Sequence, residues 1–320
     1  MYALIHRGLV GFAMGGYATV IPLYIMEITP VAKRTVYGTM NQFGISFGVF
    51  LANLVGAFLS WRNLAIVGAA VPLIQILLSK LIPESPVFTE NIKSVEATIS
   101  LPKESLCVCK NAKPLFVCSI LLLFQQISGI NPVQLNLSSL IKSRMGPTIA
   151  ASSKLIAGFL CVPLLACAGR RVTWALSCFG CAISLFLLAF SHGTMEQLSI
   201  GSAFSFLFSF CLGLGPMPWF IIPEMFDDSV RSEASSLLTS SWSIFSFAVT
   251  LLYPILCEFL GCQATLAAFG VFMVVGAVFG IYAIKPHVPE GAQQLDLGID
   301  LNNEDVFVLD EVAGDSEDEA

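Results

Sequence analysis

Residues 115–140 read LFVCSILLLFQQISGINPVQLNLSSL, an apolar run long enough to cross a lipid bilayer as a helix. The segment QQISGIN at 125–131 interrupts this run with three carboxamides, a hydroxyl and a glycine, and it carries no charge. Amides at membrane depth are costly unless something hydrogen-bonds them. Because each carboxamide both donates and accepts, a neutral ligand with many hydroxyl groups is a natural candidate.

The composition of the whole chain agrees with a membrane protein. Hydrophobic residues make up 56% and charged residues only 12%, whereas soluble domains have roughly a quarter charged residues. We therefore expect an all-α polytopic membrane protein with about nine transmembrane helices. The expected spans are 3–25, 37–59, 63–82, 114–140, 149–168, 172–191, 197–221, 234–254 and 264–284.

The net charge of −6 is dominated by one end of the chain. Residues 286–320 hold 11 of the 22 acidic residues and no Lys or Arg, so the remainder carries 16 cations against 11 acids. This tail is expected to be a solvated, disordered extension. A solubilising role and a regulatory or partner-binding role both remain open for it.

Cationic residues gather in alternate loops and predict the topology. The positive-inside rule places the richer set in the cytoplasm, together with the long loop 83–113 and the C-terminus. That set contains Lys33, Arg34, Lys80, Lys93, Lys103, Lys110, Lys113, Arg170, Arg171, Arg231 and Lys285, against Arg62, Lys142 and Arg144 on the other side. Nine spans with a cytoplasmic C-terminus put the N-terminus outside, so we expect a segment to be missing upstream.

A short repeat indicates how much is missing. Glu27 is followed seven residues later by Arg34, and Glu224 by Arg231, with 197 residues between the two pairs. Each pair sits at the cytoplasmic end of an expected span, and six spans separate them, as in transporters built from parallel repeats. Chance, or ordinary charges at helix ends, is the alternative. The repeat predicts that the first half lacks its first three spans.

Six stretches together resemble the sugar-porter, or glucose transporter-like, family of the major facilitator superfamily. They are RGLVGFAMGGYATVIPLYIMEITPVAKR (7–34), NQFGISFG (41–48), PESPVF (83–88), QQISGIN (125–131), AGRR (168–171) and GLGPMPWFIIPEMF (213–226). The resemblance implies a major facilitator fold of two six-helix bundles, of which this chain matches spans four to twelve. It divides the chain into a partial N-terminal bundle (1–82), a cytoplasmic loop (83–113), a complete six-helix bundle (114–285) and the acidic tail (286–320).

The resemblance also implies the residues of the site. Those expected to bind substrate are Gln42, Gln125, Gln126, Asn131 and Trp219. Those expected in a cytoplasmic ion-pair network that biases the transport cycle are Glu27, Arg34, Arg170, Arg171, Glu224 and Arg231. Structural alternatives stay open for both sets: the glutamines could join helices by hydrogen bonds, Trp219 could serve only in packing, and the charges could mark only the cytoplasmic side.

The chain departs from the family pattern at several positions. Lys154 stands at a substrate-facing position that usually holds Asn, and Cys211 where glucose transporters often have a polar or acidic residue. Leu135 and Asn136 replace paired tyrosines that gate the outer side. These changes put classical glucose specificity in doubt. The family's first span, which tells proton symporters from facilitators, has no counterpart here.

The expected function is transport of a hexose or similar neutral polyol by alternating access, by an incomplete or degenerate copy. A non-transporting sugar sensor, or a transporter of inositol or an organic acid, is the alternative. We expect an integral plasma-membrane protein with a small sugar and the lipid bilayer as partners and no nucleic acid. No enzymatic chemistry, cofactor or metal site is indicated: the three histidines are isolated, and Cys178 and Cys181 form a CxxC within an expected span.

Overall fold

The computed structural model describes residues 2–30, 34–85, 109–141, 143–191, 195–226 and 230–284. Within these ranges every regular element is a helix. Eight stretches are long and apolar enough to cross a bilayer. The expected all-α polytopic membrane fold is therefore confirmed, while the tail 286–320 and most of the loop 83–113 lie outside the described residues.

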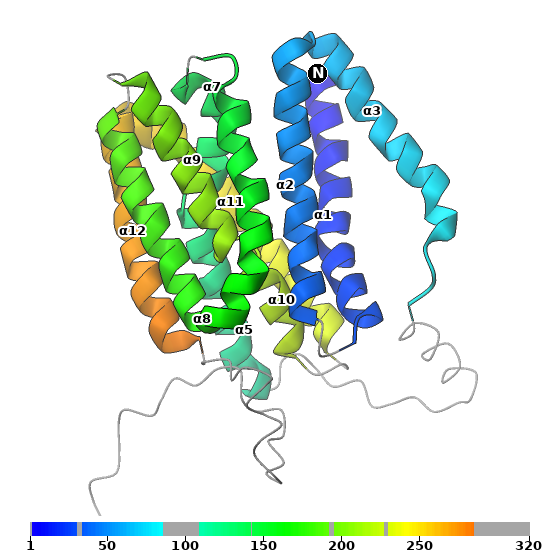
Figure 1. Ribbon diagram of the computed structural model, residues 1–320. Helices are drawn as coiled ribbons and strands as arrows, with labels where there is room; N and C mark the ends of the chain where they lie inside the picture. Colours follow the sequence, from blue (N-terminus) through cyan, green and yellow to red (C-terminus); the bar gives the residue numbers. More distant parts are fainter. Residues whose placement is uncertain are drawn as a thin grey trace, which may run out of the picture.

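The first three helices form a loosely packed group (Figure 1). They are α1 (Tyr2–Ile28), α2 (Arg34–Phe58) and α3 (Trp61–Leu78), and a short 3-10 turn, η2 (Ser79–Leu81), follows them. Helices α1 and α2 lie beside the second half of the chain, whereas α3 leans away from it. No residue of α3 is buried.

The second group of helices is far better packed. Its elements are α5 (Cys109–Ile127), α6 (Ile130–Leu135), α7 (Leu137–Leu140), α8 (Gly146–Ser191), α9 (Glu196–Leu212), α10 (Met217–Glu224), α11 (Arg231–Leu260) and α12 (Cys262–Ala283). Helix α5 begins within the expected interdomain loop, four residues before the boundary at 113. The expected division into domains remains a prediction.

The 46-residue helix α8 accounts for the difference between eight stretches and nine expected spans. An unbroken helix of that length would be roughly 70 Å long, more than twice the thickness of the hydrocarbon core of a bilayer. Gly169 breaks it, because its φ of 73° and ψ of 169° are not helical. The two parts of α8 thus correspond to the separate spans expected at 149–168 and 172–191.

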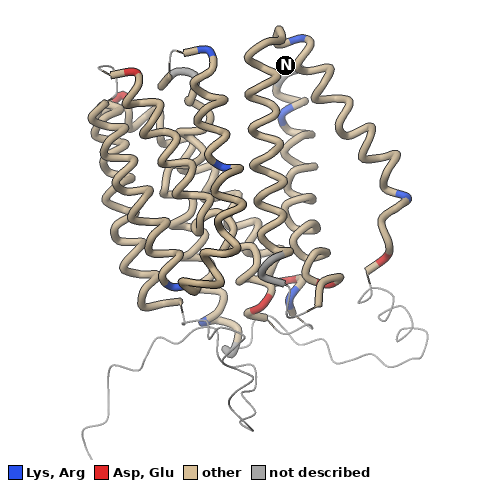
Figure 2. The backbone as a smooth tube through the Cα atoms, in the orientation of Figure 1, with Lys and Arg blue, Asp and Glu red and all other residues tan. Residues whose placement is uncertain are grey.

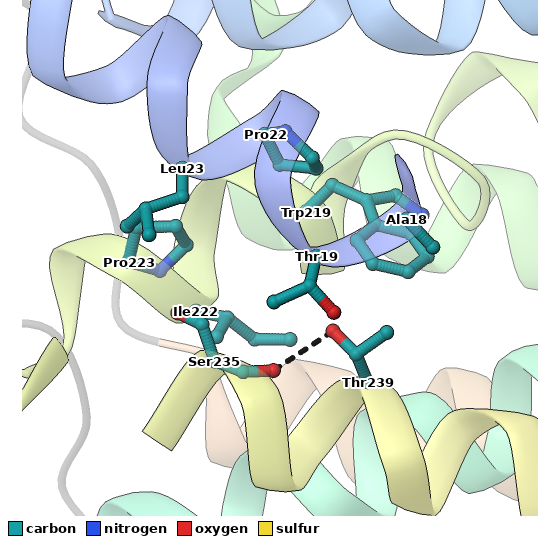
Figure 3. A pocket seen from close by; sticks show the side chains of 9 residues that line it. All are labelled: Ala18, Thr19, Pro22, Leu23, Trp219, Ile222, Pro223, Ser235 and Thr239. Carbon is teal, nitrogen blue, oxygen red and sulfur yellow. Dashed lines mark hydrogen bonds between the residues drawn. The ribbon is translucent and has the colours of Figure 1, made fainter. Parts of the chain in front are cut away.

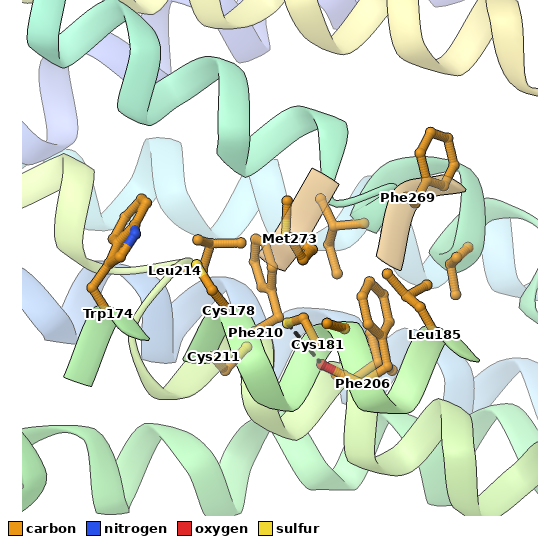
Figure 4. Packing of buried hydrophobic residues seen from close by; sticks show 14 of the residues in the cluster. Trp174, Cys178, Cys181, Leu185, Phe206, Phe210, Cys211, Leu214, Phe269 and Met273 are labelled. Carbon is orange, nitrogen blue, oxygen red and sulfur yellow. Dashed lines mark hydrogen bonds between the residues drawn. The ribbon is translucent and has the colours of Figure 1, made fainter. Parts of the chain in front are cut away.

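The main hydrophobic core lies among α8, α9 and α12 (Figure 4). Trp174, Phe206 and Met273 are fully buried there. The Trp174 ring lies over Gly280, where an added β carbon would come within 2.0 Å of it. Small residues commonly allow such close approach between membrane helices, so Gly280 is needed for α12 to pack against α8.

The internal repeat is visible in the helix boundaries. Shifted by 197 residues, the start of α2 at Arg34 falls on the start of α11 at Arg231. Helix α3 follows α2 as α12 follows α11, but its start, shifted by 197 residues, falls four residues before the start of α12. Helix α12 packs against α8, whereas the main contacts of α3 among the described elements are with α2 and η2. Residues in equivalent positions therefore have different surroundings in the two halves.

Candidate functional site

The QQISGIN segment forms a break between α5 and α6. Helix α5 ends at Ile127, and Gly129 adopts a left-handed φ of 75° before α6 begins at Ile130. A β carbon on Gly129 would lie 2.5 Å from the ring of Phe269 on α12. Both the backbone conformation and the close neighbour therefore require glycine here.

Gln125 is hydrogen-bonded to the protein through both ends of its amide. Its Nε2 donates to the carbonyl oxygens of Leu214 (3.1 Å) and Gly215 (2.9 Å), and its Oε1 accepts from Nε1 of Trp242 (2.9 Å). The two carbonyls belong to the non-helical turn 213–216 between α9 and α10. This buried amide joins three helical segments. Its contacts therefore agree with the alternative that Gln125 holds helices together by hydrogen bonds.

Gln126 and Asn131 form a second amide cluster with Ser246 of α11. The Nδ2 of Asn131 donates to Oε1 of Gln126 and to Oγ of Ser246, at 2.7 Å each. Within the described ranges, no hydrogen bond is recorded for the amide nitrogen of Gln126, the side-chain oxygen of Asn131 or the hydroxyl hydrogen of Ser246. The NH2 group of Gln126 (1% exposed) and the hydroxyl of Ser246 are thus two donor groups without a recorded partner among the described residues, and the side-chain oxygen of Asn131 is one such acceptor.

Trp219 of α10 lies between this cluster and the first half of the chain. Its ring contacts that of Trp242 edge-on, with centroids 5.4 Å apart and planes at 70°. Figure 3 shows the indole beside Ala18 and Thr19 of α1, where it lines a small hollow. Trp219 therefore joins α1 to the part of the second half that carries the amides, through contacts that are mainly apolar.

Gln42 reaches the second half from α2. Its Nε2 lies 4.0 Å from Sγ of Cys211 on α9, and Oγ of Ser46 lies 3.9 Å from the same sulfur. In this part of the interface, Lys154 of α8 donates to Oε1 of Gln134 on α6. The structure brings Gln42 to Cys211, and within the described residues it records no hydrogen bond between Gln42 and the amides of α5 and α6.

An open hollow of about 510 Å³ lies along one face of α11. It is lined by Trp242, Ser243, Ser246, Phe247, Thr250, Leu251 and Pro254. Trp242 and Ser246 are also the hydrogen-bond partners of Gln125 and Asn131. The amide segment of α5 and α6 therefore borders the hollow through these two residues.

One ion pair of the expected cytoplasmic network is formed. Arg170 and Glu224 approach to 2.9 Å, and their side chains are 12% and 17% exposed. The Arg170 guanidinium also lies 5.4 Å from the centroid of the Phe220 ring. Phe220 in turn packs on Gly38 of α2, where an added β carbon would lie 2.8 Å from it. The pair itself is within the second half, and Phe220 connects it to the first.

The other expected network residues bind different partners. The Nε of Arg171 donates to the carbonyl of Ile284, and that of Arg231 to the carbonyl of Pro223, both at 2.7 Å. Glu27 accepts a hydrogen bond from Ser85 of the PESP stretch. The side chain of Arg34 lies outside the described residues. The role of these residues as a conformational switch remains a prediction.

Ser246 and Gln134 are site neighbours that sequence reasoning missed. Ser246 follows Trp242 by one helical turn, so both face the amides from the same side of α11. Gln134 follows Asn131 by three residues on α6 and belongs to the same face. Helical spacing from Asn131 could have found Gln134, whereas α11 carries no expected substrate-binding residue from which Ser246 could have been found. Lys154 was noted in the sequence, and its partner Gln134 was not.

Comparison with known proteins assigns the family. A family model described as "Sugar (and other) transporter" matches residues 1–106 and 90–290. The chain belongs to this sugar transporter family. Its relatives are named as transporters rather than enzymes, and the chain is an integral, multi-pass membrane protein.

Several curated proteins are related to this chain at similar levels of sequence identity. Sugar transporter ERD6-like 1 of Arabidopsis thaliana is 27% identical over 319 residues, covering 86% of this chain and 67% of the relative. Sugar transporter ESL1 of the same plant is 29% identical, covering 89% and 70%. The facilitated trehalose transporter Tret1 of Drosophila pseudoobscura pseudoobscura is 27% identical, covering 89% and 38%. The chain thus spans between 38% and 70% of the length of these curated relatives.

Solved structures support the fold. The proton:xylose symporter XylE bound to 6-bromo-6-deoxy-D-glucose matches with a TM-score of 0.68 at 19% identity, covering 82% of this chain and 66% of that one. A partially occluded, inward-open structure of XylE from E. coli matches with a TM-score of 0.66 at 20% identity. The expected major facilitator fold is therefore confirmed. Among the described residues no cluster of metal-ligating side chains occurs.

Proposed function

We propose that this chain binds a hexose or a similar hydroxyl-rich solute and moves it across a membrane by alternating access. The observation that carries the proposal is the cluster of Gln126, Asn131 and Ser246. Its two open donor groups and one open acceptor group suit adjacent sugar hydroxyls, each of which donates and accepts. Family membership supports the same substrate class.

Conformational change in this proposal depends on contacts between the halves at the cytoplasmic end. Phe220 packs on Gly38 there and also contacts Arg170, which pairs with Glu224. We propose that this largely buried pair differs in strength between the two states, which biases the balance between them. We further propose that the cycle runs in the plasma membrane, with the C-terminus in the cytoplasm, as the loop charges favour.

Uptake of tracer D-glucose into cells without their own hexose uptake tests the proposal. We expect the chain to confer saturable uptake and Gln126→Ala and Asn131→Ala to reduce it. The matched control is Gln75→Ala, because Gln75 is exposed on α3 and should leave uptake unchanged.

Binding to the purified chain in lipid nanodiscs is measured beside uptake. Binding without uptake by the chain would contradict transport and favour a sugar sensor. Unchanged binding and uptake in both the Gln126→Ala and Asn131→Ala variants would refute the proposed site. The proposed topology is checked separately by the accessibility of a C-terminal tag to protease in intact and permeabilised cells.

A further inference from the structure

Lys154 is a cation in the interior of the helix bundle. It lies eight residues after the start of α8 at Gly146, which is about 12 Å along the helix. Its side chain is only 3% exposed. Among the Lys and Arg side chains that the structure describes, no other is buried.

No carboxylate of the described chain compensates this charge. The only hydrogen bond recorded for Lys154 among the described residues goes to Gln134, although an ammonium has three donors. The described acidic residues lie in the first or last turn of a helix or outside one, and Figure 2 shows them toward the two ends of the bundle. Ionisable residues in membrane interiors are costly and usually pair with an opposite charge or line a solute pathway.

Lys154 also lies between polar groups of the two halves. Its partner Gln134 stands one turn beyond Asn131 on α6. Helix α8 also packs against α2 of the first half, and Gln42 and Ser46 of α2 contact Cys211 of α9. Lys154 is therefore joined, through Gln134, to the helix that carries Asn131.

We propose that Lys154 selects a sugar that carries a carboxylate, of the hexuronate class. This inference rests on the proposed function, because it assigns the substrate of that same site. The hydroxyl groups of the ring bind the amides of α5 and α6, and the carboxylate accepts from the ammonium of Lys154. A charge-assisted hydrogen bond of this kind is stronger than a neutral one. Lys154 thus acts as a specificity residue, and its charge is compensated when the substrate is bound.

Competition binding to the purified chain in lipid nanodiscs tests the inference, with D-glucuronate and D-glucose as the probes. We expect wild-type protein to bind D-glucuronate at least about tenfold more tightly than D-glucose. The reason is that a hydrogen bond to a charged group stabilises the complex more than a hydrogen bond between neutral groups does. Lys154→Gln should bring the ratio near one and retain D-glucose binding. Lys154→Arg, which keeps the charge, should keep a preference for the acid.

The matched control is Lys80→Gln, because Lys80 is exposed in η2, just after α3, and its removal should leave the ratio unchanged. Equal or tighter binding of D-glucose by wild-type protein would overturn the inference, and so would an unchanged ratio in Lys154→Gln. The wild-type comparison decides the matter even where a variant fails to fold. Binding of D-glucose without D-glucuronate refutes this inference alone, whereas binding of neither refutes the proposed function as well.

Discussion

The neighbouring residues Gln125 and Gln126 should respond very differently to replacement by alanine. Gln125 makes three hydrogen bonds to the protein, two to the turn 213–216 and one from Trp242. Gln126 makes one, accepted from Asn131. Side-chain hydrogen bonds between membrane helices contribute about 0.6 kcal/mol each on average, so Gln125→Ala should cost about 2 kcal/mol of stability and Gln126→Ala about 0.6 kcal/mol.

Thermal unfolding of the purified chain in lipid nanodiscs, with and without D-glucose, measures the difference. We expect Gln125→Ala to lower the melting temperature of the free protein clearly more than Gln126→Ala does. Gln126→Ala should instead lose most of the stabilisation that added sugar gives to wild-type protein. Gln75→Ala on the exposed face of α3 is the matched control. Equal losses of stability in the two variants would refute the assignment of Gln125 to bracing the turn.

Three further changes probe the break, the ion pair and the hollow. Gly129→Ala should destabilise the protein by at least about 1–2 kcal/mol, measured by thermal unfolding, because a left-handed non-glycine residue is strained and the new β carbon meets a ring of α12. Arg170→Ala and Glu224→Ala should show a coupling of about 1 kcal/mol in a double-mutant cycle, and fully additive losses would contradict a working pair. Ser246→Ala should weaken sugar binding. Ser243→Ala should not, because the hydroxyl of Ser243 donates to a carbonyl of its own helix.

Most of the fold could be predicted from the sequence, because membrane spans are long and uniformly apolar. The break in α8 could be expected at AGRR, since Gly169 separates two apolar stretches that are each long enough to span. The start of α5 at Cys109 was less predictable, because the polar residues before Pro114 resemble a loop. They continue the helix beyond the apolar part, where composition gives no signal.

Only part of the site could be predicted from the sequence. The sequence gives the chemistry of each side chain, but it does not give the residues that the side chain contacts. Gln125 and Gln126 look alike in the sequence, yet successive residues of a helix point in directions about 100° apart. One consequently faces the turn 213–216 and the other faces Asn131. The partner of Lys154 depended on the relative position of α6 and α8, which no local pattern determines.

The serine-rich start of α11 explains why Ser246 stands apart from its neighbours. The hydroxyls of Ser236, Ser240, Ser241 and Ser243 each donate to the carbonyl four residues earlier. Such hydroxyls need no partner from another helix, so a helix with many serines can border an open hollow without unmet hydrogen bonds. Ser246 instead accepts from Asn131 and makes no recorded bond to its own helix within the described residues. Its hydroxyl is therefore placed to donate to a solute held by the amides.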